Sequence, residues 1–274
     1  MMRFPPRLLW DLARVGIAQK VFGATRYPWA LHLDLAQSRA HTEVTSPNGV
    51  DSSAEISSRD SQALSQVHTS PAPVVWIGGD TPLHHARIGH LAREIVDCGR
   101  TVFVEMDGTL LRRRIHEFRP VSRLYLVLPL NGLEDVHNLR AQHTGNFRAT
   151  MEALRTAKLS GFHICIETTI FPGSDRSEFL ALTKFISTLD VDGWIHKRHS
   201  AAANDETISK TLQSARDLIP SGHWRAFSAL LDLTSASAQP GVEKKRTANP
   251  VVEKLEKVPT LEAREAHEEG LRAL

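Results

Sequence analysis

Short apolar runs alternate with longer amphipathic stretches between residues 72 and 195. The short runs are rich in β-branched and aromatic residues and end at glycines or polar turn residues, which predicts buried strands. The stretches between them, such as residues 88–96, repeat apolar residues at helical spacing. With a further run near the N-terminus, the pattern predicts six strands, at residues 29–35, 74–77, 101–105, 124–130, 162–171 and 191–195. Regular strand–helix alternation implies parallel strands, so we expect an α/β fold, a partial (β/α)6 TIM-like barrel.

Two regions depart from this alternation. Residues 41–72 contain eight serines and few large apolar residues, a composition that predicts a mobile loop. Residues 236–274 carry seven acidic and seven basic residues, which predicts a charged, disordered tail. The expected organisation is therefore an N-terminal helix over 1–28, a barrel over 29–235 with the loop 41–72, and the tail.

The N-terminal segment 1–28 carries five basic residues against one acid, Asp11, with apolar residues between them. It could lie on an anionic membrane surface, or it could close the bottom of the barrel. We favour the second interpretation, because the apolar residues do not gather on one clean face. No run reaches the roughly 20 apolar residues of a membrane span. We expect a cytoplasmic protein, with peripheral contact at the inner membrane face as the alternative.

The net charge and the cysteine and histidine residues argue against nucleic-acid binding and against a resident metal ion. The net charge of +2 gives no basis for a nucleic-acid partner. Cys98 and Cys165 are the only cysteines, too few for a four-thiolate cluster, and both are expected to be buried free thiols. Fourteen histidines suggest a metal site, but neither His84-His85 nor the run 196–199 has the helical i, i+4 spacing of paired ligands. No resident metal is therefore predicted.

Several segments in order carry a family resemblance. The run VWIGGDTPLH, residues 75–84, resembles the Gly-Gly-Glu-Pro segment of radical S-adenosylmethionine (SAM) enzymes. Residues 99–137, 157–175 and 189–195 resemble later β units of that superfamily, most closely its adenosyl-hopene-forming, hopanoid-biosynthesis branch. The likeness extends over about residues 20–200. It implies that the expected partial barrel is of the radical SAM type.

The cluster motif of that family is absent from the matching position. In the family, three cysteines in the loop after the first strand bind a [4Fe–4S] cluster through soft thiolates, and the cluster cleaves SAM. Here the equivalent positions are Arg39, Glu43 and Ser46, and no cysteine precedes Cys98. The resemblance therefore implies that a [4Fe–4S] cluster is not expected.

Other positions of the family's SAM site survive in part. The resemblance assigns cofactor binding to six residues at the carboxyl ends of the strands: Gly78, Gly79, Asp80, Asp107, Asn131 and Glu167. Asp80 replaces the usual glutamate, and Asn131 replaces an aspartate. The alternative is that the two glycines form an ordinary βα turn and the acids are solvated.

Together these features predict a degenerate radical SAM-fold protein that acts as a binding or accessory protein. It would hold SAM or a lipid-like small molecule, or pair with an active relative as its protein partner. The alternative is a radical SAM-type enzyme that acts on a hopanoid-like lipid, with cluster ligands supplied by a partner or by unconventional residues. The sequence leaves open whether the protein is an enzyme.

Overall fold

The computed structural model describes residues 2–23, 27–33, 53–78, 85–171, 174–199 and 206–237. Arg39, Glu43 and Ser46, which stand at the positions of the family's cluster ligands, lie outside these residues. Gly79 and Asp80 lie outside them as well. Of the predicted tail, residues 236 and 237 end a helix, and the rest lies outside the described ranges. None of the helices in the described residues is long and apolar enough to span a bilayer.

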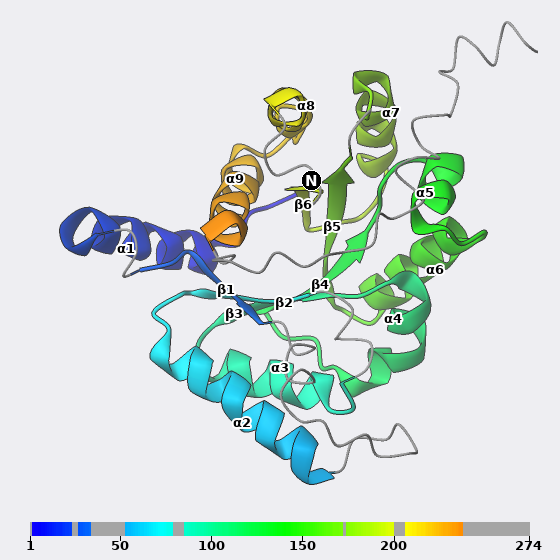
Figure 1. Cartoon of the computed structure of the whole chain (residues 1–274). Coiled ribbons are helices and arrows are strands. Elements are labelled where there is room, and N and C mark those ends of the chain that lie inside the picture. The colour runs from blue at the N-terminus through cyan, green and yellow to red at the C-terminus, as the bar shows by residue number, and fades with distance from the viewer. Residues whose placement is uncertain are drawn as a thin grey trace, which may run out of the picture. The chain divides into compact units, whose positions relative to one another are not determined.

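Six parallel strands form one sheet in chain order, β1-β2-β3-β4-β5-β6. Their bounds are Ala30–Leu33 (β1), Val74–Ile77 (β2), Thr101–Glu105 (β3), Leu124–Pro129 (β4), His163–Ile170 (β5) and Gly193–Arg198 (β6). The sheet curls (Figure 1), and sequential parallel order is the topology of a partial TIM-like barrel. The predicted α/β fold class and the partial (β/α)6 barrel are confirmed.

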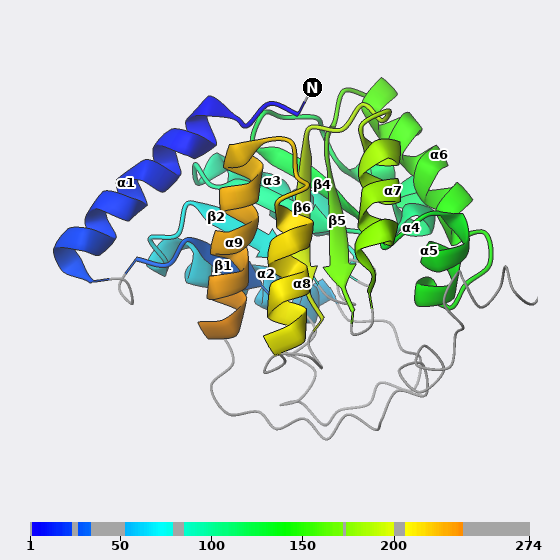
Figure 2. The ribbon, with the colours of Figure 1, turned by 90° about the horizontal axis from the view of Figure 1, so that it is seen from above.

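Most helices connect successive strands and cover the outer side of the sheet (Figure 1). They are α2 (Ser53–Thr69), α3 (Ile88–Asp97), α4 (Gly108–Arg114), α5 (Glu134–Ala141), α6 (Asn146–Leu159) and α7 (Arg176–Ile186), with a 3-10 turn at Ile115–Glu117. Helix α8 (Glu206–Arg216) follows β6 and contacts β5 and β6. The helix α9 (Gly222–Ser237) is placed differently, since it contacts both edge strands, β6 and β1. It therefore lies across the open side of the half-barrel (Figure 2).

A row of rings fills the concave side of the sheet. His32, Trp76, Phe103, Tyr125 and His163 occupy matching register positions on β1 to β5. Their centroids are 6.4, 5.4, 4.9 and 5.1 Å apart along the row. Offset contacts between rings at such distances are favourable beyond the burial of their area. The row forms a solid floor beneath the carboxyl ends of the strands.

Helix α9 completes this floor with two aromatic side chains. Phe227 lies 5.4 Å from the ring of Phe103, and Trp224 lies 6.3 Å from that of Tyr125. Trp224 packs so closely on β6 that a Cβ added to Gly193 would lie 2.5 Å from the indole. Only a residue without a side chain allows this approach.

Helix α2 lies within the segment 41–72, for which the sequence predicted a mobile loop. Residues 53–69 are helical, and Asp60, Ala63 and Val67 are buried at spacings of three and four. Ala63 and Val67 belong to the main hydrophobic core. The serines 57, 58, 61 and 65 lie on the exposed side. For residues 53–69 the prediction was wrong, because small and polar residues make up most of the buried face and composition gave a weak apolar signal. Residues 41–52 lie outside the described residues.

The N-terminal segment forms helix α1 (Pro6–Phe22), whose Leu8, Leu12 and Val15 are buried. Before the helix, Phe4 packs edge-on against Trp224 and Phe227, at 4.9 and 5.8 Å. Trp224 packs on Gly193, the first residue of β6, so Phe4 lies near the amino end of that strand.

Candidate functional site

Two carboxylates and one ammonium group meet at the carboxyl ends of the strands. The Nζ atom of Lys197, on β6, lies 3.4 Å from Oε2 of Glu105 and 3.5 Å from Oε1 of Glu167. Glu105 ends β3 and Glu167 lies within β5. The contacts of Lys197 therefore join β6 to two other strands of the curled sheet. The indole N–H of Trp76 donates to the same Oε2 atom of Glu105, at 3.4 Å. We call Glu105, Glu167 and Lys197 the mouth cluster.

Glu167 is the most perturbed member of the mouth cluster. Its side chain is only 2 % exposed, and its Oε2 atom has no hydrogen-bond partner within the described part of the chain. Burial, followed by the nearby charge of Glu105, raises the pKa of Glu167 to about 7, although Lys197 opposes this shift. Glu167 therefore exchanges a proton near neutral pH. A buried carboxyl oxygen without a partner, directed at a site, is a feature of functional positions.

Lys197 stays charged in this setting. The carboxylates of Glu167 and Glu105 raise its pKa, because each stabilises the ammonium form. Its side chain is 44 % exposed, so the mouth cluster opens to solvent on this side.

A small cavity of about 30 Å³ lies beside the mouth cluster, with room for roughly one or two water molecules. Its lining comes from four strands and α9: His32, Trp76, Glu167, Ile195, His196, Lys197, Leu231 and Asp232. Burial and the charge of Lys197 lower the pKa of His32 to about 4, so this imidazole is neutral. The site thus combines a protonatable carboxyl group, a neutral imidazole, an indole N–H and an ammonium group.

Gly78 supports this arrangement through its lack of a side chain. A Cβ at this position would lie 2.7 Å from Oε2 of Glu105 and 2.9 Å from Nε1 of Trp76. The glycine therefore leaves room for the hydrogen bond between these two side chains. Of the four sequence-predicted site residues that the structure describes, Gly78 and Glu167 lie at the mouth cluster.

Asp107 and Asn131 have local structural partners. The Oδ1 atom of Asp107 caps helix α4 by accepting from the backbone N–H of Leu110 at 2.7 Å. The Oδ1 atom of Asn131 accepts from the backbone N–H of Thr169 at 2.9 Å and so ties β4 to β5. Both side chains hold the rim of the barrel in shape.

Sequence reasoning assigned no site role to Lys197, His32, Trp76 or Glu105. Glu105 is the last residue of a predicted strand, the place where barrels carry functional residues. Lys197 lies two residues beyond the predicted strand 191–195, since β6 continues to Arg198. A predicted sixth strand that extended to residue 198 would have placed Lys197 at the carboxyl end of the strands, where site residues are expected.

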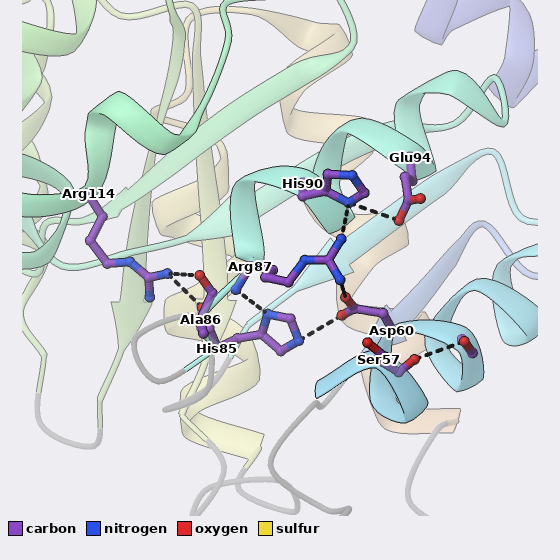
Figure 3. A network of polar contacts seen from close by, with 9 residues as sticks. Ser57, Asp60, His85, Ala86, Arg87, His90, Glu94 and Arg114 are labelled. Carbon is purple, nitrogen blue, oxygen red and sulfur yellow. Dashed lines mark hydrogen bonds and ion pairs between the residues drawn. The ribbon is translucent and has the colours of Figure 1, made fainter. Parts of the chain in front are cut away.

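A second polar network holds the chain that follows β2 (Figure 3). Nε2 of His85 lies 2.9 Å from Oδ1 of Asp60, and Nδ1 of His85 accepts from the backbone N–H of Arg87 at 3.3 Å. Burial lowers the pKa of His85, so the neutral ring donates from Nε2 to the carboxylate. Arg114 donates to the backbone carbonyl of His85 at 2.6 Å. The network joins α2 to the start of α3 and to α4.

Of the histidines considered as metal ligands, His84 lies outside the described residues, and His85 and His196 have other partners. His85 pairs with Asp60, and His196 is buried edge-on against Trp194, with ring centroids 4.6 Å apart. Burial and the charge of Arg216 lower the pKa of His196 to about 3. Among the described residues, no group of three His, Cys, Asp or Glu side chains is arranged to hold a metal ion.

The thiols that the chain possesses do not fit a cluster at the family position. Cys165 is fully buried within β5. Cys98 ends α3, just before the amino end of β3, and its Sγ atom lies 3.8 Å from Nε2 of His68 on α2. Cluster ligation in the family needs three thiolates in the loop after the first strand, and neither residue is near that loop in the sequence.

Comparisons with known proteins give one family model and several distant solved structures. The model of the radical SAM superfamily matches residues 61–186. No curated protein matches the chain. Among solved structures, TYW1 with a lysine–pyruvate adduct bound is 15 % identical over 65 % of each chain, with a TM-score of 0.45. SuiB of Streptococcus suis bound to S-adenosylmethionine is 12 % identical over 77 % of this chain and 50 % of its own, with a TM-score of 0.49.

The alignments with these two structures therefore cover between half and two thirds of their chains. The family match spans β2 to β5 and the helices between them, which are the centre of the half-barrel. Over these residues the chain is similar to the radical SAM superfamily.

Proposed function

We propose that this protein is a degenerate radical SAM-type half-barrel that binds a small ligand at the mouth cluster and acts as a binding or accessory protein. The single observation that carries the proposal is Glu167, a buried carboxyl group with an unpartnered oxygen beside a lysine and a second carboxylate. A site of this kind provides recognition without a metal ligand of its own.

The ligand that fits these groups best carries an amino-acid end. An ammonium group would be held by the carboxylates of Glu105 and Glu167, and a carboxylate would pair with Lys197. SAM has both groups at its methionyl end, and SuiB, which shares this fold at low identity, has been solved with SAM bound. A lipid-like ligand that bears an amine would use the same carboxylates.

The proposed accessory role follows from the missing thiolates. When bound, a [4Fe–4S] cluster supplies the electron that cleaves SAM, and it needs soft anionic ligands. Arg39, Glu43 and Ser46 stand at the family's ligand positions. A guanidinium cannot bind a cation, and a neutral hydroxyl is a poor ligand. The protein would therefore present its ligand to an active relative, or pair with one.

Calorimetry with SAM tests the binding site. We expect the wild-type chain to bind SAM and leave it intact, and Glu167→Gln to weaken binding by roughly ten- to a hundredfold, the loss typical of a hydrogen bond to a charged group. Glu152→Gln serves as the matched control, because Glu152 forms an exposed ion pair with Arg112 on the outer helices. Equal affinities for all three proteins, or no binding, would reject the site.

Anaerobic reconstitution with iron and sulfide tests whether the chain can hold a [4Fe–4S] cluster and cleave SAM. We expect iron and sulfide well below one cluster per chain. About four irons per chain, with reductive cleavage of SAM, would reject the accessory role. That result would instead favour an enzyme with unconventional ligands, acting on a hopanoid-like lipid.

A further inference from the structure

Helix α1 is apolar on two opposite sides. Its inner side packs Leu8, Leu12 and Val15 into the protein. On its outer side, Trp10, Ile17 and Val21 are 67, 65 and 66 % exposed. These three residues are seven and four positions apart, so they form one stripe along the helix, opposite the buried side. In Figure 1 and Figure 2, α1 runs along the periphery of the fold, beside the β1 edge.

The exposed apolar residues are concentrated on this helix. Of the nine large hydrophobic residues that are exposed in the described part of the chain, five belong to α1: Leu9, Trp10, Ile17, Val21 and Phe22. The other four are spread over 133–180. Isolated exposed apolar residues are ordinary, whereas a contiguous set marks an interaction surface. The groove beside the stripe continues it through Ala13, Gly16 and Trp29.

The charges around the stripe have one sign. Arg7 and Arg14 border it on one side and Lys20 on the other, and all three are exposed. Asp11 is the one acidic residue between positions 6 and 22. It faces inward, where its Oδ2 atom lies 2.9 Å from Nη1 of Arg123. The outward surface of α1 therefore carries positive charge only.

We infer that the outer face of α1 binds an anionic membrane surface. A helix with an apolar stripe between basic borders lies in the interface plane, with its apolar residues in the acyl boundary and its basic residues at lipid phosphates. Trp10 suits this depth, because tryptophan prefers the membrane interface. Charge complementarity selects the membrane over a second copy of the chain, since two such faces would bring like charges together. The inner face anchors α1 to the barrel, so binding brings the whole protein to the membrane.

Co-sedimentation of the full chain with lipid vesicles tests this inference. We expect binding to vesicles that contain phosphatidylglycerol, weak binding to pure phosphatidylcholine, and release by salt. The variant Arg7→Gln/Arg14→Gln/Lys20→Gln should lose roughly a hundredfold in affinity, about fivefold for each basic residue. The variant Trp10→Ser/Ile17→Ser/Val21→Ser should lose binding to both kinds of vesicle. Because these side chains point outward, circular dichroism should show unchanged folding.

Leu139→Ser/Leu159→Ser is the matched control, since it removes exposed apolar residues elsewhere on the surface. It should bind vesicles as the wild type does. Equal vesicle binding by the α1 variants, or no binding by the wild type, would overturn the inference. So would a wild-type dimer in light scattering that the Trp10→Ser/Ile17→Ser/Val21→Ser variant converts to monomer, because a second copy would then cover the stripe.

Discussion

Glu167 lowers the stability of the folded protein when it is charged, and it is also the residue to which we assign a binding role. Its burial beside Glu105 disfavours the charged form, and Lys197 compensates only in part. The usual pKa of a glutamate is about 4.3, so the folded protein holds this proton more tightly than the unfolded chain does. Between these two pKa values, the folded state binds more protons, and stability falls as the pH rises.

Replacing Glu167 should therefore stabilise the protein in a pH-dependent way. We expect Glu167→Gln to raise the free energy of unfolding by roughly 3–4 kcal/mol at pH 8 and to change it little at pH 4.5, because the neutral amide resembles the protonated acid. Urea denaturation at both pH values measures this difference. The exposed Glu152→Gln should behave alike at both. A destabilised Glu167→Gln at pH 8 would contradict the proposed burial cost.

Gly193 allows a second test at the residue scale. An added methyl group would lie 2.5–2.7 Å from the rigid indole of Trp224. Overpacking of this kind costs about 1–3 kcal/mol, so Gly193→Ala should lower the free energy of unfolding by that amount. At Gly222, an added Cβ meets nothing within 4 Å, and Gly222→Ala should be neutral or slightly stabilising. Equal denaturation midpoints for the two variants would show that Trp224 moves aside freely.

At the scale of elements, helix α2 depends on polar contacts as well as on packing. Asp60 is buried, and it accepts from His85 while Nη1 of Arg87 lies 3.6 Å away. Both partners belong to the segment between β2 and α3. The pair thus couples the position of α2 to the chain that leaves the mouth of the barrel.

Removal of one partner should loosen this helix. Asp60→Ala leaves the Nε2–H group of His85 buried without its acceptor, so we expect a loss of about 2–3 kcal/mol of stability. Hydrogen exchange should rise first in α2. Asp97→Asn is the control, because Asp97 lies in an exposed i, i+4 pair with Arg93 and should change stability by less than about 1 kcal/mol. Unchanged exchange in α2 of Asp60→Ala would mean that packing alone holds the helix.

For the whole molecule, buried neutral histidines set the response to acid. Burial lowers the pKa of His137 to about 4 and that of His196 to about 3, with smaller effects from Arg140 and Arg216. The unfolded value is near 6.5, so between these pKa values the unfolded chain binds more protons. The stability that these residues contribute is complete above pH 6.5 and is lost as the pH falls.

The stability of the wild-type protein should therefore fall between pH 6.5 and pH 5. Burial also lowers the pKa of His32 to about 4, so three histidines each cost about 2 kcal/mol over this interval, and the protonation of Glu167 offsets about 2 kcal/mol of the sum. In Glu167→Gln the offset is gone, so the fall should be about one and a half times as steep. Denaturant titrations at four pH values measure both slopes. The exposed His143→Gln should follow the wild type, and a flat wild-type profile would contradict the prediction.

The amino-acid sequence alone determined the number, order and parallel direction of the strands, because apolar periodicity and turn residues act locally. It also determined which cysteines are available as cluster ligands, since this depends only on the positions of the cysteines in the sequence. The mouth cluster was decided by tertiary structure: Glu105 and Lys197 are 92 residues apart and meet only because the sheet curls. Helix α2 and the outer stripe of α1 were decided in the same way. Whether an alanine is buried or a tryptophan is exposed depends on which neighbours the fold brings to that face.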